Sequence, residues 1–301
     1  MLAFACAVDG GSGRSVTGAN LLFRSALQGR DVCYLDLDPP TARALFRVEE
    51  PLGGIDDSVH EYLESRVAEP RRIDVWSESE RETLRRPDRG TGRMVLLPGG
   101  RADDVAAHPW AIDRFTELLM RLEEEFDTTL VSLPAGRRHS LDMALAATAG
   151  PQLRRVEARW LVFHRWTRQH VVNTSDFVHG ERGLLDIGVA RGHDRDALLQ
   201  ATRMVRTGVT EPSGPELAGL RPAQIAWLQG ANENLQRFAS RRGIGRVNLL
   251  GAVPHDPVLQ WREQIITDDD VNLTGVANQA TVDAFTLLAG RLADDEVWAG
   301  L

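Results

Sequence analysis

An apolar run that leads directly into a glycine-rich loop is the feature that most constrains how this chain folds. Leu2 to Val8 is apolar, and the loop Asp9-Gly10-Gly11-Ser12-Gly13-Arg14-Ser15 follows it. The run predicts a buried strand, and the loop predicts a tight turn into a helix. Because backbone N–H groups gather at the start of a helix, this turn is a candidate site for a phosphate-sized anion.

The spacing of apolar residues predicts a helix directly after the loop. They recur at i, i+3, i+4, i+7 and i+8, namely at Ala19, Leu22, Phe23, Ala26 and Leu27. Gly29 marks the expected end of this helix. Residues 31–35 then predict a second strand, which leads into Asp36 and Asp38. One stripe of the helix can therefore pack on a sheet that carries both the loop and the carboxylates.

The residue types in the loop suit phosphate chemistry. Glycines at positions 10, 11 and 13 let the backbone approach an anion, and the Ser15 hydroxyl is a candidate ligand for phosphate-bound Mg²⁺. Compared with the common phosphate-binding loop, Val8 replaces the first Gly and Arg14 replaces the Lys. Arginine stays cationic but is planar and bulkier, so it favours binding over fast chemistry. The structural alternative is an ordinary glycine-rich turn.

The two carboxylates after the second strand are candidates for a metal or a water. Side chains one residue apart on a strand point to opposite faces, unless the strand has already ended. Geometry therefore places only one of Asp36 and Asp38 in the site. The alternative for Asp38 is a turn residue before Pro39-Pro40.

The remaining pattern predicts an α/β fold, with a doubly wound, mostly parallel sheet flanked by helices. Apolar runs and periodic segments alternate along the chain. The expected strands are 94–97, 129–133, 160–163, 204–209 and 247–253, and the expected helices are 110–125, 141–149, 223–238 and 281–292. We expect one domain over residues 1–301. Residues 64–92 are dense in charge and are expected to form a solvated surface insertion.

Composition narrows the class of protein. Hydrophobic residues make up 43% and charged residues 26%, which is typical of a globular chain, and the net charge of −8 disfavours general nucleic-acid binding. Cys6 and Cys33 lie inside predicted strands and are expected to be buried thiols. The sequence shows neither a signal peptide nor an apolar run of about 18 residues, so we expect a cytoplasmic protein.

One basic and aromatic segment, residues 154–170, stands out in the acidic chain. It could contact an acidic partner, a phosphate or single-stranded nucleic acid through Trp160 and Trp166. The alternative is that Trp160 packs in the core while the arginines pair on a solvated face. His164 and Arg165 follow a predicted strand, where open parallel sheets bind ligands, so they are the better site candidates.

With both motifs in view, the chain resembles the ParA/MinD family of deviant P-loop ATPases. The loop and Asp36-Leu37-Asp38-Pro39 match the start of that family, and residues 250–257, Leu-Gly-Ala-Val-Pro-His-Asp-Pro, are similar to its base-binding segment. The Gly-Arg-Ser loop and the stretch Trp160 to His170 are similar to an actinobacterial branch of variant P-loop proteins. The resemblance covers most of the chain.

The resemblance implies a P-loop NTPase-like fold and a set of site residues. ATP or ADP would be bound by Gly10, Gly11, Ser12, Gly13, Arg14, Ser15, Val16, Pro254 and Asp256. Mg²⁺ would be held by Ser15 and Asp36, and Asp38 would position the attacking water.

Two departures from the family pattern weaken this expected site. Asp9 stands where the family has the Lys that crosses a dimer interface, so the charge is reversed. Ser132, in the run Leu130 to Gly136, stands where the family has a third metal-associated Asp. We therefore expect a weakened Mg²⁺ site.

Three classes of function fit these residues. The preferred one is a nucleotide-binding ParA/MinD-like protein with weak or absent ATPase activity, which acts as a regulatory or scaffolding partner of an unidentified protein. The alternatives are an active, nucleotide-gated dimeric ATPase switch and an ATP-dependent ligase-type biosynthetic enzyme. A homodimer is compatible with the resemblance. A membrane is not expected as a partner, because the C-terminal segment from Arg291 to Leu301 is acidic. Nucleic acid is not expected either.

Overall fold

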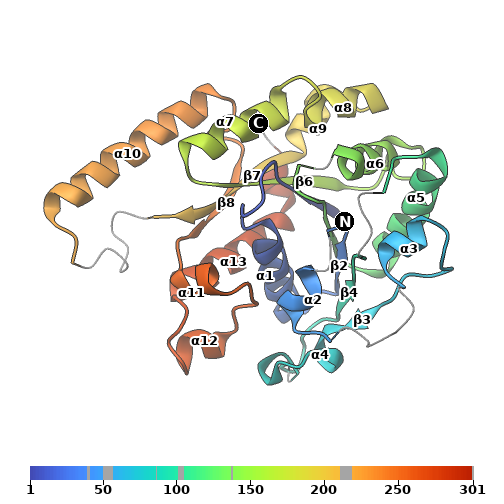
Figure 1. Cartoon of the computed structure of the whole chain (residues 1–301), viewed down its shortest axis with the longest axis horizontal. Coiled ribbons are helices and arrows are strands. Elements are labelled where there is room, and N and C mark those ends of the chain that lie inside the picture. The colour runs from blue at the N-terminus through green and yellow to red at the C-terminus, as the bar shows by residue number, and fades with distance from the viewer. Residues whose placement is uncertain are drawn as a thin grey trace.

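A single sheet of eight strands forms the centre of the molecule (Figure 1). The computed structural model describes residues 1–38, 41–49, 57–85, 87–100, 105–136, 138–210 and 219–299. The strand order is β3-β4-β2-β5-β1-β6-β7-β8. The strands are β1 (Leu2–Cys6), β2 (Val32–Asp36), β3 (Ile73–Asp74), β4 (Met94–Leu97), β5 (Thr128–Ser132), β6 (Ala158–Arg165), β7 (Thr202–Val209) and β8 (Leu249–Pro254). The α/β class and the mostly parallel sheet are confirmed, since only β3 pairs antiparallel, with β4.

Helices cover both faces of the sheet (Figure 1). Those packed on one face are α3 (Val59–Leu63), α5 (Pro109–Glu125), α6 (Arg138–Ala149), α7 (Arg168–His179), α8 (Leu184–Arg191), α9 (Arg195–Gln200) and the end of α10 (Pro222–Arg241). Those on the other face are α1 (Arg14–Leu27), α2 (Thr41–Phe46), α4 (Val75–Glu78), α11 (Pro257–Trp261) and α13 (Gln279–Leu292). The short helices α12 (Asp268–Asn272) and α14 (Asp295–Trp298) complete the C-terminal part.

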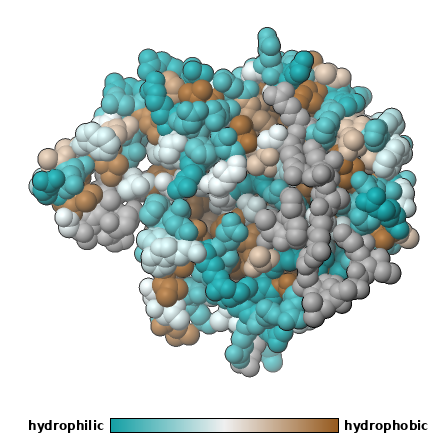
Figure 2. Space-filling view, in the orientation of Figure 1, coloured by the Kyte–Doolittle hydropathy of each residue, from teal (hydrophilic) through white to brown (hydrophobic). Residues whose placement is uncertain are grey.

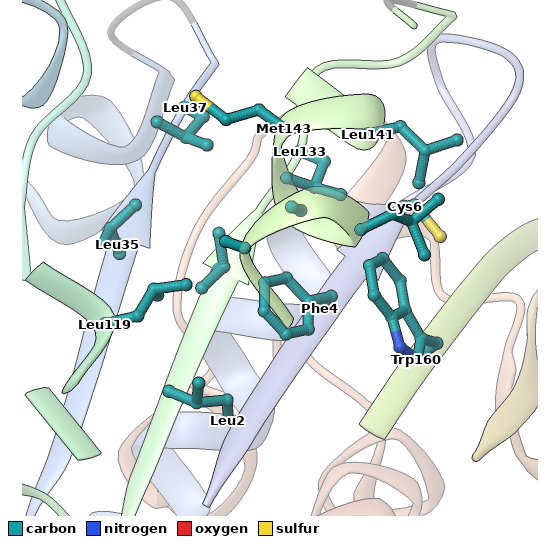
Figure 3. Close-up of a cluster of buried hydrophobic side chains, with 14 of the residues drawn as sticks. Leu2, Phe4, Cys6, Leu35, Leu37, Leu119, Leu133, Leu141, Met143 and Trp160 are labelled. Atoms are coloured by element: carbon teal, nitrogen blue, oxygen red, sulfur yellow. The ribbon is translucent and has the colours of Figure 1, made fainter. Parts of the chain in front are cut away.

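The central strand β1 shows how the sequence builds both faces. Leu2, Phe4 and Cys6 belong to the apolar cluster under α5 and α6, which Figure 3 shows. The intervening alanines belong to the cluster under α1. This alternation follows from the two-residue period of a strand, and the small alanines leave room for α1 to lie close to the sheet.

The charged segment 64–92 differs in part from the expectation. It contains the edge strand β3, helix α4 and a short 3₁₀ helix, Glu82–Leu84. Ile73, Val75 and Leu84 are buried in the core, so the segment is not wholly solvated. These three core positions were not predicted, because they stand singly among charged residues and a short edge strand needs few apolar residues.

The face of the molecule drawn in Figure 2 is mixed rather than divided into large apolar areas. On the face drawn in Figure 2, hydrophilic residues dominate and the hydrophobic residues form small separate groups. Helix α10 extends away from the sheet in Figure 1, and Ala239 is its one buried residue. Within the described ranges, no helix combines the length and apolarity needed to cross a membrane.

Candidate functional site

The glycine-rich loop joins β1 to α1 at the carboxyl end of the parallel strands. Gly11 and Gly13 have φ angles of 69° and 75°, in the left-handed region that glycine tolerates best. Gly13 is the N-cap of α1, and no side chain caps this helix. The first N–H groups of α1 are therefore free of side-chain acceptors, as an anion site at a helix N-terminus requires.

A pocket of about 500 Å³ opens beside this loop. Its lining brings together Gly11, Gly13 and Thr17 from the loop and α1, Arg165 from the end of β6, and the segment around Trp261. The Thr207 hydroxyl donates a hydrogen bond of 2.6 Å to the Ser12 carbonyl, which ties the loop to β7. This end of an open parallel sheet is where such folds bind ligands.

Arg165 supplies positive charge to the pocket. Its Nη2 donates to the Gln260 side chain at 3.3 Å, and no carboxylate of the described residues pairs with it. Arg168, three residues later, instead stacks its guanidinium 4.0 Å from the Phe238 ring centre on α10. The two arginines therefore serve different surfaces.

Asp9 is turned away from the pocket. Its carboxylate accepts a hydrogen bond of 2.9 Å from Asn173 and lies 3.5 Å from His170, both on α7. The negative charge that reverses the family pattern therefore anchors the loop to α7 instead of facing a bound anion.

Arg14 does not point outward into the pocket. Its side chain is only 6% exposed, and it pairs with Asp38 and donates to the Leu133 carbonyl. A further contact of 3.4 Å joins its Nη2 to the Ser15 hydroxyl. The guanidinium is therefore committed to the strand ends of β2 and β5.

Asp36 is buried at the end of β2. One of its oxygens accepts from the Asp38 N–H at 3.1 Å and the other from the Ala42 N–H at 3.3 Å, near the start of α2. Burial raises the pKa of Asp36 to about 8, although Arg14 and the Ala42 N–H oppose this shift. Because β2 ends at Asp36, the side chain of Asp38 does not have to follow the alternation of a strand between the two faces of the sheet. Both carboxylates therefore lie near Arg14. Pro39 and Pro40 lie outside the described residues.

This arrangement does not fit a Mg²⁺ ion on Ser15 and Asp36 while Arg14 keeps its place. The guanidinium of Arg14 pairs with Asp38, contacts the Ser15 hydroxyl and lies near Asp36, so it occupies the place where such an ion would have to lie. Mg²⁺ requires near-octahedral oxygen ligands. The described residues contain no group of three His, Cys, Asp or Glu side chains suited to a metal.

Ser132 lies beside Asp36, at the ends of the neighbouring strands β5 and β2. It is the partner of Asp36 in the pairing of β2 with β5, and it is fully buried. Burial and Asp36 raise the pKa of Tyr34, whereas the neighbouring Ser132 and Ser15 hydroxyls lower it. The floor of the site is thus occupied by hydroxyl groups, which add no negative charge near neutral pH.

The second predicted motif borders the pocket without presenting its carboxylate to it. Pro254 lines the pocket, but Asp256 is only 1% exposed. The Asp256 carboxylate accepts from the Val258 and Asn278 N–H groups and from the Thr281 hydroxyl, at 3.2, 2.9 and 2.7 Å. Asp256 therefore fixes the starts of α11 and α13 and positions the pocket wall.

His164 is buried rather than exposed to a ligand. Its Nδ1 lies 3.1 Å from the Arg165 carbonyl, and its Nε2 has no recorded partner in the described part of the chain. Burial, Arg206 and His170 lower the pKa of His164 to about 4, although the Arg165 carbonyl opposes them.

This histidine predicts a pH-dependent stability. Because its pKa is lowered in the fold, His164 stabilises the protein above the unfolded pKa of about 6.5, and that contribution is lost as the pH falls toward 4. We expect a loss of about 2 kcal/mol by about pH 5. Urea unfolding at a series of pH values checks this, with His164→Gln as the reference that lacks the titration. Parallel pH profiles of the two proteins would contradict it.

Several residues of the pocket were not predicted from the sequence. Trp261 is 78% exposed on its wall, next to Arg262, and Gly208 lines it from the end of β7. The large aromatic residue five positions after Asp256 could have indicated this wall of the pocket, because exposed aromatic rings offer stacking surfaces.

Comparison with known proteins shows a shared fold. The MinD cell division protein of Aquifex aeolicus aligns with a TM-score of 0.56 and 17% identity, over 97% of this chain and 95% of that one. The pNOB8 ParA bound to nonspecific DNA aligns with a TM-score of 0.55 and 13% identity, over 97% of both chains. Cobyrinic acid a,c-diamide synthase of Mycobacterium smegmatis, with bound ADP and magnesium, aligns with a TM-score of 0.53 and 16% identity, over 97% and 92%.

No protein-family model and no curated protein sequence matches the chain. The likeness to these structures is thus one of fold alone.

Proposed function

We propose that this ParA/MinD-like chain binds ATP or ADP at residues 10–16, has weak or absent ATPase activity, and acts as a regulatory or scaffolding partner of another protein. The observation that carries the proposal is the uncapped start of α1, which lies beside a pocket that also presents Arg165 and Trp261. Backbone N–H groups and a cation suit phosphates, and an exposed indole suits a base.

The proposed weakness of turnover follows from charge. Phosphoryl transfer depends chiefly on neutralising the negative charge of the transition state. Here Arg14 is committed to Asp38 and Leu133, and Ser132 replaces the expected third carboxylate. The site therefore has reduced means to hold a metal beside a triphosphate. Metal binding by Ser15 and Asp36 and water positioning by Asp38 would each require Arg14 to leave its place beside them.

The two other classes of function predict different measurements. An active dimeric switch requires a steady ATPase rate that Asp38→Ala abolishes, together with ATP-dependent doubling of the mass by light scattering. A ligase-type enzyme requires a second substrate site. A pocket of about 400 Å³ on the α7 side of the loop, lined by Val8, Pro134 and Phe177, is the observation that favours it.

The proposed partners are a nucleotide and a protein, with a homodimer as a compatible assembly. The acidic residues of α14 disfavour anionic lipid, and the net charge of −8 disfavours nucleic acid. One basic surface could nevertheless bind nucleic acid. It consists of two hollows beside α10, which are lined by Arg168, Arg206, Arg237, Arg241 and Arg246. A DNA shift assay near physiological salt is therefore part of the test.

Replacing Arg165 tests the nucleotide site. We expect Arg165→Ala to weaken ADP binding by about 1.5–3 kcal/mol, the scale of a charge-assisted hydrogen bond. Arg168→Ala is the matched control, since it removes the same charge from the neighbouring position that faces α10. Calorimetric titration of ADP into the three proteins gives the affinities.

Two results would overturn this assignment. Equal losses in the two variants would indicate a general charge effect, and an absence of ADP binding by the unaltered protein would remove the nucleotide function. A steady ATPase rate in the same samples, abolished by Asp38→Ala, would favour the switch instead.

A further inference from the structure

The guanidinium of Arg14 lies among the groups that would otherwise surround a divalent cation. It pairs with Asp38, contacts the Ser15 hydroxyl at 3.4 Å and lies close enough to Asp36 to be affected by its charge. We propose that Arg14 is a built-in cation of this site, which replaces a divalent ion and makes nucleotide binding independent of Mg²⁺. The nucleotide part of this inference rests on the proposed function, whereas the metal part does not.

The hydrogen-bond geometry holds Arg14 in place. Its two terminal nitrogens are engaged by Leu133 and Asp38, which belong to segments 119 and 24 residues away in the sequence. The Leu133 carbonyl follows β5 directly, so the guanidinium bridges the ends of two neighbouring strands. A buried guanidinium with two fixed acceptors has little freedom to swing aside for an incoming ion.

The positive charge of Arg14 also disfavours a divalent ion at this position. The described residues around the guanidinium supply two carboxylates, Asp36 and Asp38, and Asp38 pairs with it directly. A divalent ion placed beside Arg14 would be repelled by its positive charge. The ion would have to displace Arg14 from a buried position, which would leave the guanidinium without its partners.

The start of α1 and the guanidinium of Arg14 consequently have different roles in the site. The N–H groups at the start of α1 and Arg165 face the pocket, while Arg14 faces the strand ends below the loop. The positive charge of Arg14 lies next to the loop without any outward contact. It therefore balances the carboxylates that would repel a phosphate, as a bound cation would.

Manganese titration tests the metal part directly. The probe is Mn²⁺, followed by electron paramagnetic resonance, on the whole chain without nucleotide and with ADP. We expect the unaltered protein to bind no Mn²⁺ at this site and Arg14→Ala to gain a site that Asp36→Asn removes. Arg14→Lys is the second variant and should gain no Mn²⁺ site, because a lysine keeps the positive charge although it loses the two-pronged contact.

Arg24→Ala is the matched control. Arg24 lies on the same helix, is only 5% exposed, and pairs with Asp268 at 2.5 Å and with the Ile266 carbonyl at 2.7 Å, away from the loop. It should gain no Mn²⁺ site, which separates the effect of this position from the loss of any buried arginine.

Nucleotide affinity gives the second readout. We expect ADP affinity of the unaltered protein to differ by less than about twofold between Mg²⁺ and chelator, and that of Arg14→Ala to become at least about tenfold tighter with Mg²⁺. Mn²⁺ binding by the unaltered protein that Asp36→Asn abolishes would overturn the proposal. So would a folded Arg14→Ala protein that gains no Mn²⁺, or an Arg14→Lys protein that binds Mn²⁺ as well as Arg14→Ala does, because the charge at position 14 would then not exclude the ion. If no protein binds ADP, the proposed function fails, and the Mn²⁺ spectra alone still decide the role of Arg14.

Discussion

Arg14→Ala is expected to lower the free energy of unfolding by about 3–5 kcal/mol, the range measured when one partner of a buried ion pair is removed. Arg14 and Asp38 are 6% and 15% exposed, so the pair is largely shielded from water. Without the guanidinium, the Asp38 carboxylate and the Leu133 carbonyl lose their donor together. Urea unfolding followed by circular dichroism near neutral pH measures the loss.

A double-mutant cycle isolates the Arg14–Asp38 interaction. Asp38→Ala alone leaves a buried cation, whereas Arg14→Ala/Asp38→Ala removes both charges and should recover part of the lost stability. A coupling energy within about 0.5 kcal/mol of zero would contradict the assigned pair, because independent sites are additive to that precision.

The β1–loop–α1 unit could be predicted because its signals are local. An apolar run of strand length, three glycines and an apolar stripe of helical period all lie within the first 29 residues. The structure places β1, the left-handed glycines and α1 accordingly. Each of these signals acts through backbone conformation or through one face of an element, so no distant residue was needed.

The orientation of Arg14 could not be predicted because its partners are distant. The sequence placed a cation at the loop, and a phosphate contact was the natural expectation for it. Its acceptor Leu133 comes from another strand end, and the register of β2, β5 and β1 brings them together. The side chain follows the nearest buried acceptors, which only the folded sheet defines.

Neighbouring residues on β6 show a similar limit. His164 and Arg165 were both expected at the site, because both follow a strand at the ligand-binding end of a sheet. Arg165 lines the pocket, whereas His164 is fully buried between the strand and Trp166. Consecutive residues of a strand point to opposite faces. The sequence therefore predicted which end of the strand lies at the pocket, but not which of the two side chains faces it.

Trp160 is the residue of the basic and aromatic segment on which the core interpretation depended. It could have offered a stacking surface for nucleic acid, but it is 1% exposed and among the largest fully buried side chains. Its ring stacks on Phe4 with centroids 4.5 Å apart, and the two residues are partners in the pairing of β1 with β6 (Figure 3). The expected packing of Trp160 in the core is confirmed, whereas the expected pairing of the arginines with carboxylates is wrong for Arg165, which has none among the described residues and contacts Gln260.

Trp160→Ala is therefore expected to destabilise the protein by about 3–5 kcal/mol, through lost burial and the cavity left beside Phe4. Because β6 carries Arg165 at its end, the same change should loosen the pocket wall, so the unfolding transition and ADP binding should weaken together. Trp227→Ala is the control, since Trp227 is 74% exposed on α10 and should change stability by less than about 0.5 kcal/mol. Equal effects of the two substitutions in urea unfolding would mean that Trp160 is not the central core residue that its stacking with Phe4 indicates.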